Sequence, residues 1–266
     1  MSPAVLALEC VILAVLAAVF SMVGQGGGAT YVPVLVTAGL SMHEASTVSL
    51  FMIMVASLSA TIVFSRGKTV DWGLLLAIVP LAVVGSFAGG YVAQWVSGQV
   101  LRVVFAAVLL LAAVLLLRPS VEGQTPGFMS GWPRSERRCG AYEYRIALVL
   151  IVPATALAGL VAGMIGVGGG LFVLPLLVLL GGCPTRIAIG VSSTYVGLAA
   201  APGFLGHLAG GESFDVWMAL PLAAAAFVGA RVGPSLSLRA NVRQLRLTLS
   251  VVLVGLAAWM VALAFR

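Results

Sequence analysis

Apolar runs of nearly membrane-spanning length recur along the whole chain, and they constrain its fold more than any other feature. Hydrophobic residues make up 61% of the 266 residues and charged residues 8%, whereas roughly 25% of the residues in an ordinary soluble domain are charged. An α-helix needs about 20 apolar residues to cross a bilayer. A membrane β-barrel would show shorter segments of alternating polarity. We therefore expect an all-α polytopic membrane protein.

The chain contains an internal duplication. Residues 22–35 (MVGQGGGATYVPVL) and 164–177 (MIGVGGGLFVLPLL) are identical at seven of their fourteen positions, and weaker likeness follows in the remainder of both halves. We divide the chain into a first membrane repeat (1–117), a polar connector (118–144) and a second membrane repeat (145–266). Duplications of this kind place a transport pathway at the interface of the repeats.

Each repeat divides into five apolar segments. Those of the first repeat are 4–23, 29–40, 43–64, 72–97 and 100–117. Those of the second repeat are 145–165, 171–181, 185–206, 215–237 and 243–265. The second segment of each repeat provides only about 18 Å of helix, which is shorter than the bilayer core of about 30 Å. We expect these two segments to be short broken helices, because each directly follows a glycine triplet.

The distribution of Lys and Arg predicts the orientation of the repeats. With five crossings per repeat and the N-terminus outside, eleven of the fourteen Lys and Arg side chains face the cytoplasm, whereas four crossings would give a split of eight to five. Positive charge is enriched in cytoplasmic loops. An odd number of crossings inverts the second repeat relative to the first, and this also holds if the glycine-flanked pairs only reach the midplane. We expect both termini outside and the connector in the cytoplasm.

The glycine triplets are the leading candidates for a binding site. Their six backbone positions are Gly26, Gly27, Gly28, Gly168, Gly169 and Gly170. A helix N-terminus carries about half a positive charge and unpaired N–H donors, so it suits a small anion. Inverted repeats would direct two such termini to one site at the midplane. Close helix packing through small residues is the alternative, although packing does not require glycine on every helix face.

Polar side chains near the triplets are further candidates for contact with a substrate. They are Gln25, Thr30, Ser49, Ser192 and Ser193. Hydroxyl and amide groups donate hydrogen bonds to an oxyanion, but Ser and Thr also connect helices to one another in membranes. The second triplet has Val167 and Phe172 where the first has Gln25 and Thr30, so the site is expected to be chemically asymmetric.

Two ionisable residues, one within an apolar segment and one at a segment end, complete the candidates. Arg231 is placed to act as a counter-charge for an anionic substrate, but it lies near the end of its segment, where a long side chain can extend to the interface. His207 is a candidate proton relay, and its alternative role is packing at a segment end. Asp71 and Asp215 open apolar segments and are expected to cap helices.

No pattern in the sequence indicates an enzyme. HExxH, GxSxG and P-loop motifs are absent, and the glycine-rich motifs do not follow a predicted strand. The three cysteines have no CxxC spacing, and the basic residues lie in loops rather than on a soluble basic face. We expect no catalytic residue, no metal, no cofactor and no nucleic-acid partner.

An ordered set of motifs resembles the sulfite exporter TauE/SafE-type permeases. The set comprises the repeated G-x-GGG followed by Pro, RGKTVDW at 66–72, the stretch from GH to FD at 206–215, and VGARVG at 228–233 with LR downstream. The resemblance covers both repeats. It implies a secondary carrier that exports a small sulfur-containing anion, such as sulfite or an organosulfonate, across the bacterial inner membrane.

Several alternatives stay open at the level of the sequence. An anion channel or uniporter, a permease for a different small anion, and a scaffold whose glycines only pack helices are each compatible with the motifs. The coupling ion is open, and so is assembly as a homodimer.

Overall fold

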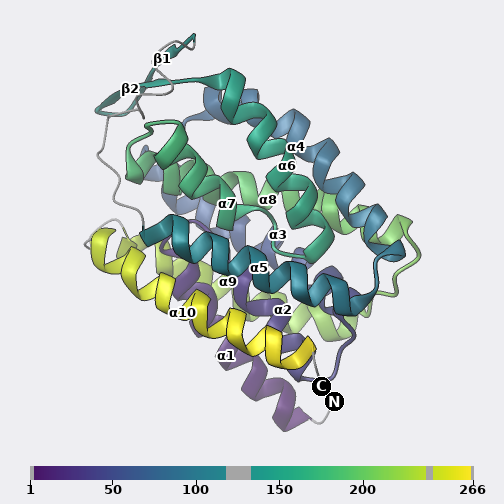
Figure 1. Cartoon of the computed structure of the whole chain (residues 1–266). Helices are drawn as coiled ribbons and strands as arrows, with labels where there is room; N and C mark the ends of the chain where they lie inside the picture. The colour runs from purple at the N-terminus through teal and green to yellow at the C-terminus, as the bar shows by residue number, and fades with distance from the viewer. Residues whose placement is uncertain (1–2, 118–132, 238–241, 265–266) are drawn as a thin grey trace.

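A computed structural model describes residues 3–117, 133–237 and 242–264. Within these ranges, ten α-helices form one bundle, and a two-stranded hairpin projects from one end of it (Figure 1). The beginning of the first helix and the end of the last lie at the opposite end of the bundle. The expected all-helical membrane fold is confirmed, with the hairpin as an addition.

The helices follow the ten expected segments to within a few residues. The first repeat contains α1 (Pro3–Ser21), α2 (Gly28–Thr37), α3 (Met42–Arg66), α4 (Trp72–Val92), the 3-10 turn η1 (Ala93–Trp95) and α5 (Gly98–Leu117). The second contains α6 (Leu148–Ile165), α7 (Gly170–Pro175), the π-helical turn η3 (Leu176–Leu180), α8 (Thr185–Ala209), α9 (Val216–Ser237) and α10 (Val242–Ala264).

Side-chain caps begin several of these helices. Ser41 and Glu44 form a capping box at the start of α3, and this pair satisfies backbone N–H groups that lack a partner within the helix. Asp71 accepts the Leu74 N–H at 2.8 Å at the start of α4, and Asp215 accepts N–H groups from the first turn of α9. Both aspartates therefore cap helices, as expected.

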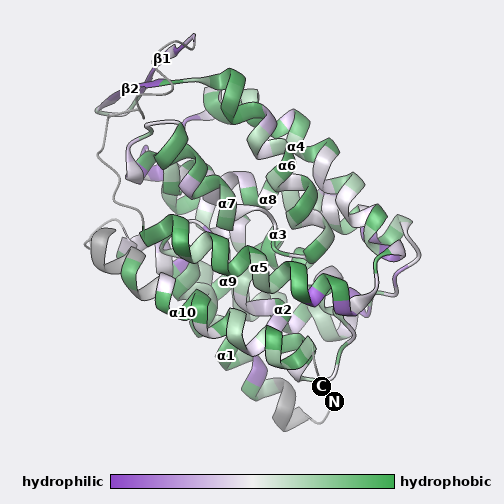
Figure 2. Ribbon diagram, viewed as in Figure 1, coloured by the Kyte–Doolittle hydropathy of each residue, from purple (hydrophilic) through white to green (hydrophobic). Residues whose placement is uncertain are grey.

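Apolar side chains cover much of the outside of the bundle. Among the described residues, six helices are long and apolar enough to cross a membrane, namely α3, α4 with η1, α5, α6, α8 and α9. Large apolar side chains such as Leu76 and Leu157 are exposed, and Figure 2 shows hydrophobic residues along the outer helices. Burial in lipid explains these exposed surfaces, because lipid tails solvate apolar side chains.

Helices from the two repeats pack closely through glycine. A Cβ atom at Gly89 of α4 would lie only 2.0 Å from the carbonyl oxygen of Leu160 on α6. A Cβ atom at Gly229 of α9 would likewise lie 2.0 Å from the carbonyl oxygen of Ala14 on α1. Since α4 corresponds to α9 and α1 to α6, the two contacts are equivalent when the repeats are exchanged. Small residues let membrane helices approach at this distance.

Helices α3 and α8 form the centre of the bundle and run antiparallel. The Thr61 hydroxyl donates to the Thr194 hydroxyl at 3.3 Å near the end of α3 and the beginning of α8. Nearer the other end of the pair, a Cβ atom at Gly203 would lie 3.4 Å from the side chain of Leu50. These two helices occupy equivalent positions in the two repeats.

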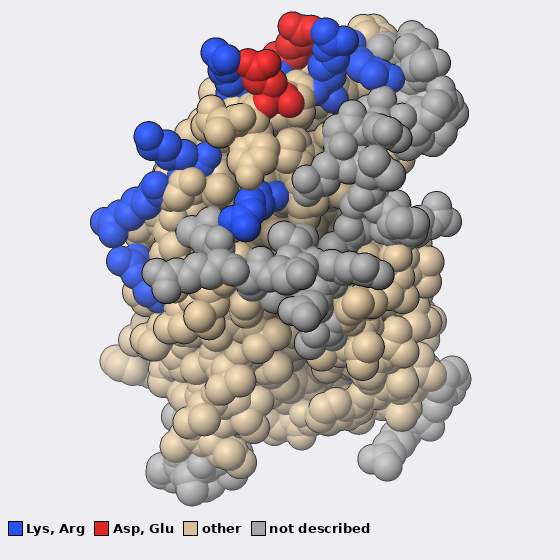
Figure 3. All heavy atoms as spheres, turned by 90° about the vertical axis from the view of Figure 1, so that its left-hand side faces the viewer, with Lys and Arg blue, Asp and Glu red and all other residues tan. Residues whose placement is uncertain are grey.

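The hairpin is formed by β1 (Ser135–Cys139) and β2 (Tyr142–Ile146). It corrects the expectation that a membrane segment begins at residue 145, because the chain is still in a strand there and α6 begins at Leu148. The rest of the connector, residues 118–132, lies outside the described residues. On the face seen in Figure 3, described Lys and Arg side chains gather toward the hairpin end, and the visible described atoms farther away are uncharged.

Candidate functional site

Two glycine bends interrupt the bundle at equivalent positions, the first at residues 24–28 and the second at residues 166–170. The φ angles are +64° at Gly26 and +89° at Gly27 in the first repeat, and +74° at Gly168 and +90° at Gly169 in the second. Residues with a Cβ atom rarely adopt this left-handed region. The glycines therefore allow the chain to turn after α1 and α6, so that α2 and α7 begin in a new direction, as the sequence predicted.

The bends contact each other across the repeat interface. A Cβ atom at Gly28 would lie 2.5 Å from the carbonyl oxygen of Val167 in the second bend. A Cβ atom at Gly170 would lie 3.0 Å from the Cα atom of Gln25 in the first bend. The two glycine-rich motifs, which lie 142 positions apart in the sequence, are thus brought together in one place.

The central helices enclose both bends. A Cβ atom at Gly168 would lie 3.0 Å from a side-chain carbon of Ile53 on α3 and 3.0 Å from one of Val196 on α8. The same two side chains lie 3.5 Å and 3.2 Å from a Cβ atom placed at Gly26. Because each bend touches the same residues of α3 and α8, the bends and the central helix pair form a single buried site.

Three of the predicted hydroxyl groups hold the bends in place. Ser49 on α3 donates to the carbonyl oxygen of Gly166 at 2.8 Å, and Ser192 on α8 donates to the carbonyl oxygen of Gly24 at 3.1 Å. Each serine thus hydrogen-bonds to the bend of the other repeat. The Thr30 hydroxyl donates to the carbonyl oxygen of Gly27 at 2.8 Å. Their hydroxyl protons are therefore used within the protein.

Several buried polar side chains near the first bend have no hydrogen-bond partner, and we call four of them the bend cluster. They are Gln25, Tyr31, Ser57 and Ser193. Gln25 is 1% exposed and the other three are completely buried. An unpaired polar group in a buried position costs about 1–3 kcal/mol, so four together at one bend require an explanation. A polar ligand that is bound there during function provides one.

Short approaches place Tyr31 and Ser57 beside the first bend, and the backbone nitrogen of Ser193 lies 3.2 Å from where a Cβ atom of Gly24 would be. The Tyr31 hydroxyl oxygen lies 2.2 Å from where a Cβ atom of Gly27 would be, and the Ser57 hydroxyl oxygen lies 2.7 Å from the corresponding point at Gly26. The sequence predicted Gln25 and Ser193 but missed Tyr31 and Ser57. A helical repeat was the available signal for Ser57, since positions 49, 53 and 57 share one face of a helix.

The remaining two predicted residues lie apart from the bend cluster. Arg231 is exposed on α9, so the structure does not bring it together with the buried groups. His207 is completely buried on α8, and its Nε2 atom lies 2.9 Å from the carbonyl oxygen of Gly163. Because a carbonyl oxygen only accepts, Nε2 donates, and Nδ1 is left as an unpaired acceptor.

No residue of the bend cluster carries a formal charge. The described part of the chain also contains no group of three or more His, Cys, Asp or Glu residues that could hold a metal ion. The cluster is therefore a set of neutral hydrogen-bonding groups beside the start of α2, where the Thr30 N–H bonds the carbonyl oxygen of Gly27 and the two amides before it have no partner within the helix. Such a set suits a small polar ligand, and an anion in particular.

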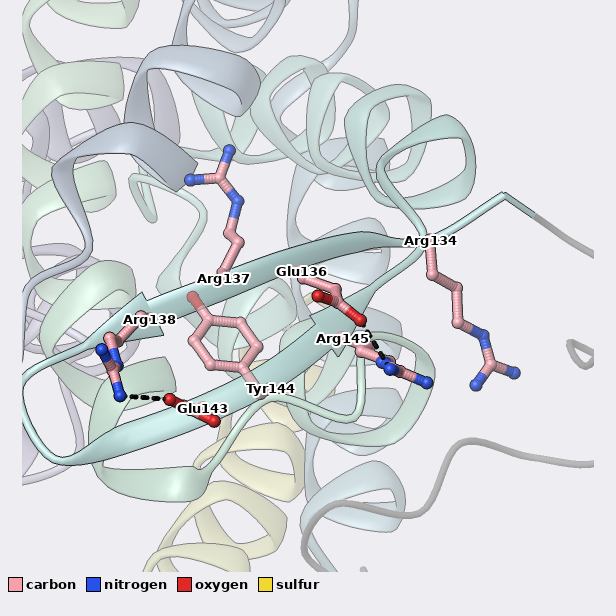
Figure 4. A pocket seen from close by; sticks show the side chains of 7 residues that line it. All are labelled: Arg134, Glu136, Arg137, Arg138, Glu143, Tyr144 and Arg145. Atoms are coloured by element: carbon pink, nitrogen blue, oxygen red, sulfur yellow. Dashed lines mark hydrogen bonds and ion pairs between the residues drawn. The ribbon is translucent and has the colours of Figure 1, made fainter.

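A second polar region lies at the hairpin, where a hollow of about 670 Å³ is lined by hairpin residues (Figure 4). Arg138 pairs with Glu143, and Arg145 pairs with Glu136, each at 2.5 Å. Arg137 points away from these two exposed pairs. The hollow opens to the surface, whereas the glycine bends are buried on every side.

The hairpin is attached to the bundle through Asp71. Arg137 pairs with Asp71 at 3.3 Å, and the Tyr144 hydroxyl donates to the same carboxylate at 2.6 Å. Burial raises the pKa of Tyr144 above its ordinary value, and the hydrogen bond to Asp71 contributes to the shift. Burial also raises the pKa of Cys139, whose thiol donates to the carbonyl oxygen of Lys68. Asp71 therefore caps α4 and also fastens the hairpin.

Comparisons with known proteins extend over most of the chain. The family model described as "Sulfite exporter TauE/SafE" matches residues 10–260. The chain is 24% identical over 247 residues to "Probable membrane transporter protein YunE" of Bacillus subtilis (strain 168), which covers 88% of this chain and 89% of that protein. It is 31% identical over 110 residues to "Probable membrane transporter protein YfcA" of Escherichia coli (strain K12), 41% of each chain. No solved structure matches it.

Proposed function

Because the chain belongs to the sulfite exporter TauE/SafE family, we propose that it is a secondary transporter that exports a small sulfur-containing oxyanion, such as sulfite or an organosulfonate, across the bacterial inner membrane. The resemblance of its motifs to this family is confirmed by the family match. Membership makes the chain a multi-pass membrane transporter. The substrate, the direction of transport and the membrane are the proposal.

The bend cluster is the observation that carries the proposal. Four neutral polar side chains are buried without partners where the two glycine motifs meet. Transporter sites near the bilayer midplane are built from interrupted helices, whose N-termini point at anionic groups. Helix α2 begins at the bend and supplies such an N-terminus, and the neighbouring hydroxyl and amide groups supply further donors.

We assign the two repeats to an inverted pair. Helices α3 and α8 are equivalent and antiparallel, and the serine bonds from α3 to the second bend and from α8 to the first are exchanged with the repeats. An axis in the plane of the membrane produces this relation. Rocking of one repeat against the other would then expose the buried site to each side in turn.

The charge distribution supports export from the hairpin side. The hairpin and its surroundings carry Arg137, Arg138, Arg145 and Lys68, and positive charge marks the cytoplasmic side. An inside-negative potential drives an anion outward by about 2.3 kcal/mol per charge per 100 mV. Export of an anion therefore requires no coupling ion, although His207, with its unpaired buried Nδ1, offers a route for one proton.

Counterflow in liposomes tests the proposal. Vesicles that contain the purified protein and unlabelled sulfite should accumulate labelled external sulfite, and uptake should saturate with concentration. An anion channel would give conductance without exchange, and a scaffold would give neither exchange nor binding. Exchange of other small anions with no exchange of sulfite or any sulfonate would reject the substrate.

Two serine variants link the assay to the site. Ser57→Ala should lower the exchange rate about tenfold, because it removes one hydrogen-bonding group of the bend cluster. Ser235→Ala should leave the rate unchanged, because Ser235 lies exposed on α9 and bonds only within its own helix turn. Equal rates for both variants would place the substrate elsewhere.

A further inference from the structure

The hydrogen-bonding capacity of the bend cluster restricts the substrate more narrowly than the proposed function does. Gln25 contributes two amide donors and one carbonyl acceptor, whereas Tyr31, Ser57 and Ser193 each contribute a hydroxyl that either donates or accepts. All four side chains are buried without a partner. A ligand that offers acceptors for several donors and one donor for the Gln25 carbonyl oxygen would satisfy all four side chains.

The neutral character of the cluster bears on the charge of the ligand. Transfer of an ion from water into a buried site carries a desolvation cost that rises with the square of its charge, so a dianion costs about four times as much as a monoanion of equal size. No Lys, Arg or His belongs to the cluster, and Arg231 is exposed on α9. A monoanion is thus strongly favoured over a dianion.

The carbonyl oxygen of Gln25 bears on the protonation of the ligand. Its Oε1 atom is buried and has no donor within the protein. An oxyanion without any proton offers only lone pairs, so it would leave this oxygen unpaired and would repel it. A ligand with an O–H or N–H group would satisfy it.

Resting on the proposed function, we propose that the bend cluster selects a monoanionic oxyanion that carries its own O–H or N–H donor, and that Gln25 Oε1 accepts that hydrogen bond. Hydrogen sulfite and hydroxyalkyl sulfonates belong to this class, whereas sulfate, the sulfite dianion and simple alkyl sulfonates do not. Position 167, the counterpart of Gln25, is Val167, so the site offers this acceptor from the first repeat alone.

A matched pair of sulfonates tests the role of the donor. Ethanesulfonate and 2-hydroxyethanesulfonate carry the same charge and differ by one hydroxyl group. In counterflow against each compound, the hydroxylated anion should exchange about tenfold faster, because a buried acceptor left unpaired costs on the order of one hydrogen bond. Equal rates, or faster exchange of ethanesulfonate, would overturn the proposal while leaving the proposed function intact. No exchange of either compound or of sulfite would reject the proposed function itself.

A pair of glutamine variants assigns the preference to Gln25. Gln25→Leu should reduce the tenfold preference to about unity, since it removes the amide group that distinguishes the two anions. Gln94→Leu is the matched control, because Gln94 lies outside the site, where it bonds the carbonyl oxygen of Tyr91. Retention of the full preference in Gln25→Leu would exclude Gln25 as the acceptor.

The pH dependence of the unmodified protein tests the proposal independently of any variant. Sulfite exchange should fall as pH rises, in proportion to the loss of the hydrogen sulfite monoanion. Ethanesulfonate keeps one charge over the same range, so its exchange corrects for titration of the protein. A corrected sulfite rate that is constant or rises with pH would overturn the selection of a protonated monoanion.

Discussion

At the scale of single residues, the closeness of the two bends depends on the absence of side chains. A Cβ atom at Gly28 would lie 2.5 Å from the carbonyl oxygen of Val167, and this backbone atom cannot move without shifting the second bend. We expect Gly28→Ala to lower the free energy of unfolding by about 1–3 kcal/mol, as overpacking does elsewhere. Thermal unfolding in detergent, followed by tryptophan fluorescence, measures the change.

Gly255 provides the matched control on α10. It lies in a helix, and a Cβ atom there would meet nothing within 4 Å. Gly255→Ala should therefore leave the midpoint of unfolding unchanged or raise it, because alanine favours helix by up to about 1 kcal/mol. If the two variants unfold at the same temperature, the bends are not in contact as described.

The sequence predicted several of the residues that surround the bends, but it did not predict the hydrogen bonds that they make. Ser49 and Ser192 were expected to touch a substrate, which stays a prediction, and the structure shows that their hydroxyl groups donate to Gly166 and Gly24. These bonds cross between repeats, and spacing along the chain contains no information about them. Tyr31 was not predicted because its hydroxyl reaches the bend only after the chain has turned at Gly27.

At the scale of elements, we expect the docking of the hairpin, which is its attachment to the bundle through Asp71, to depend on the protonation of Tyr144. The neutral phenol donates to Asp71 at 2.6 Å, and burial raises its pKa above the usual value. In the undocked hairpin the phenol would ionise at about pH 10. Docking is therefore unaffected by this group below about pH 10 and should weaken as pH rises above it, because only the undocked state releases the proton readily.

Trypsin cleavage within the hairpin measures this weakening. Cleavage after Arg137 and Arg138, normalised to that of an unstructured peptide, should be slow at about pH 8 and several-fold faster at about pH 10.5. Tyr144→Phe is the control, since it has no phenol to ionise and should lose this pH-dependent step. Cleavage of the unmodified hairpin that does not depend on pH would show that Tyr144 does not control docking.

The helices and the hairpin differ in how well the sequence predicted them. Long apolar runs set the limits of the membrane helices, because each helix must match the thickness of the bilayer. The strand residues 135–139 read SERRC, which resembles a solvated loop. Their strand pairs through backbone bonds, while Arg137 and Tyr144 bind Asp71, which is 66 positions before Arg137. A contact at this distance leaves no local pattern.

At the scale of the whole molecule, equivalent helices of the two repeats make reciprocal contacts. Helix α4 lies against α6 and α8 as α9 lies against α1 and α3. The charges break this equivalence, because Lys and Arg gather at the hairpin end (Figure 3). Since this arrangement of helices is compatible with either orientation, we propose that the charge distribution selects the one with the hairpin in the cytoplasm.

Labelling of single cysteines measures this orientation. In a background in which Cys10, Cys139 and Cys183 are replaced by alanine, Glu143→Cys would mark the exposed hairpin and Ser213→Cys the exposed loop before α9. A maleimide that does not cross membranes should label Ser213→Cys in intact spheroplasts and label Glu143→Cys only after permeabilisation. The two sites lie at opposite ends of the helix pair α3 and α8, so they report opposite sides. Labelling of Glu143→Cys alone in intact spheroplasts would show that the hairpin faces the outside. Transport of an anion away from the hairpin side would then lead into the cell, against the membrane potential.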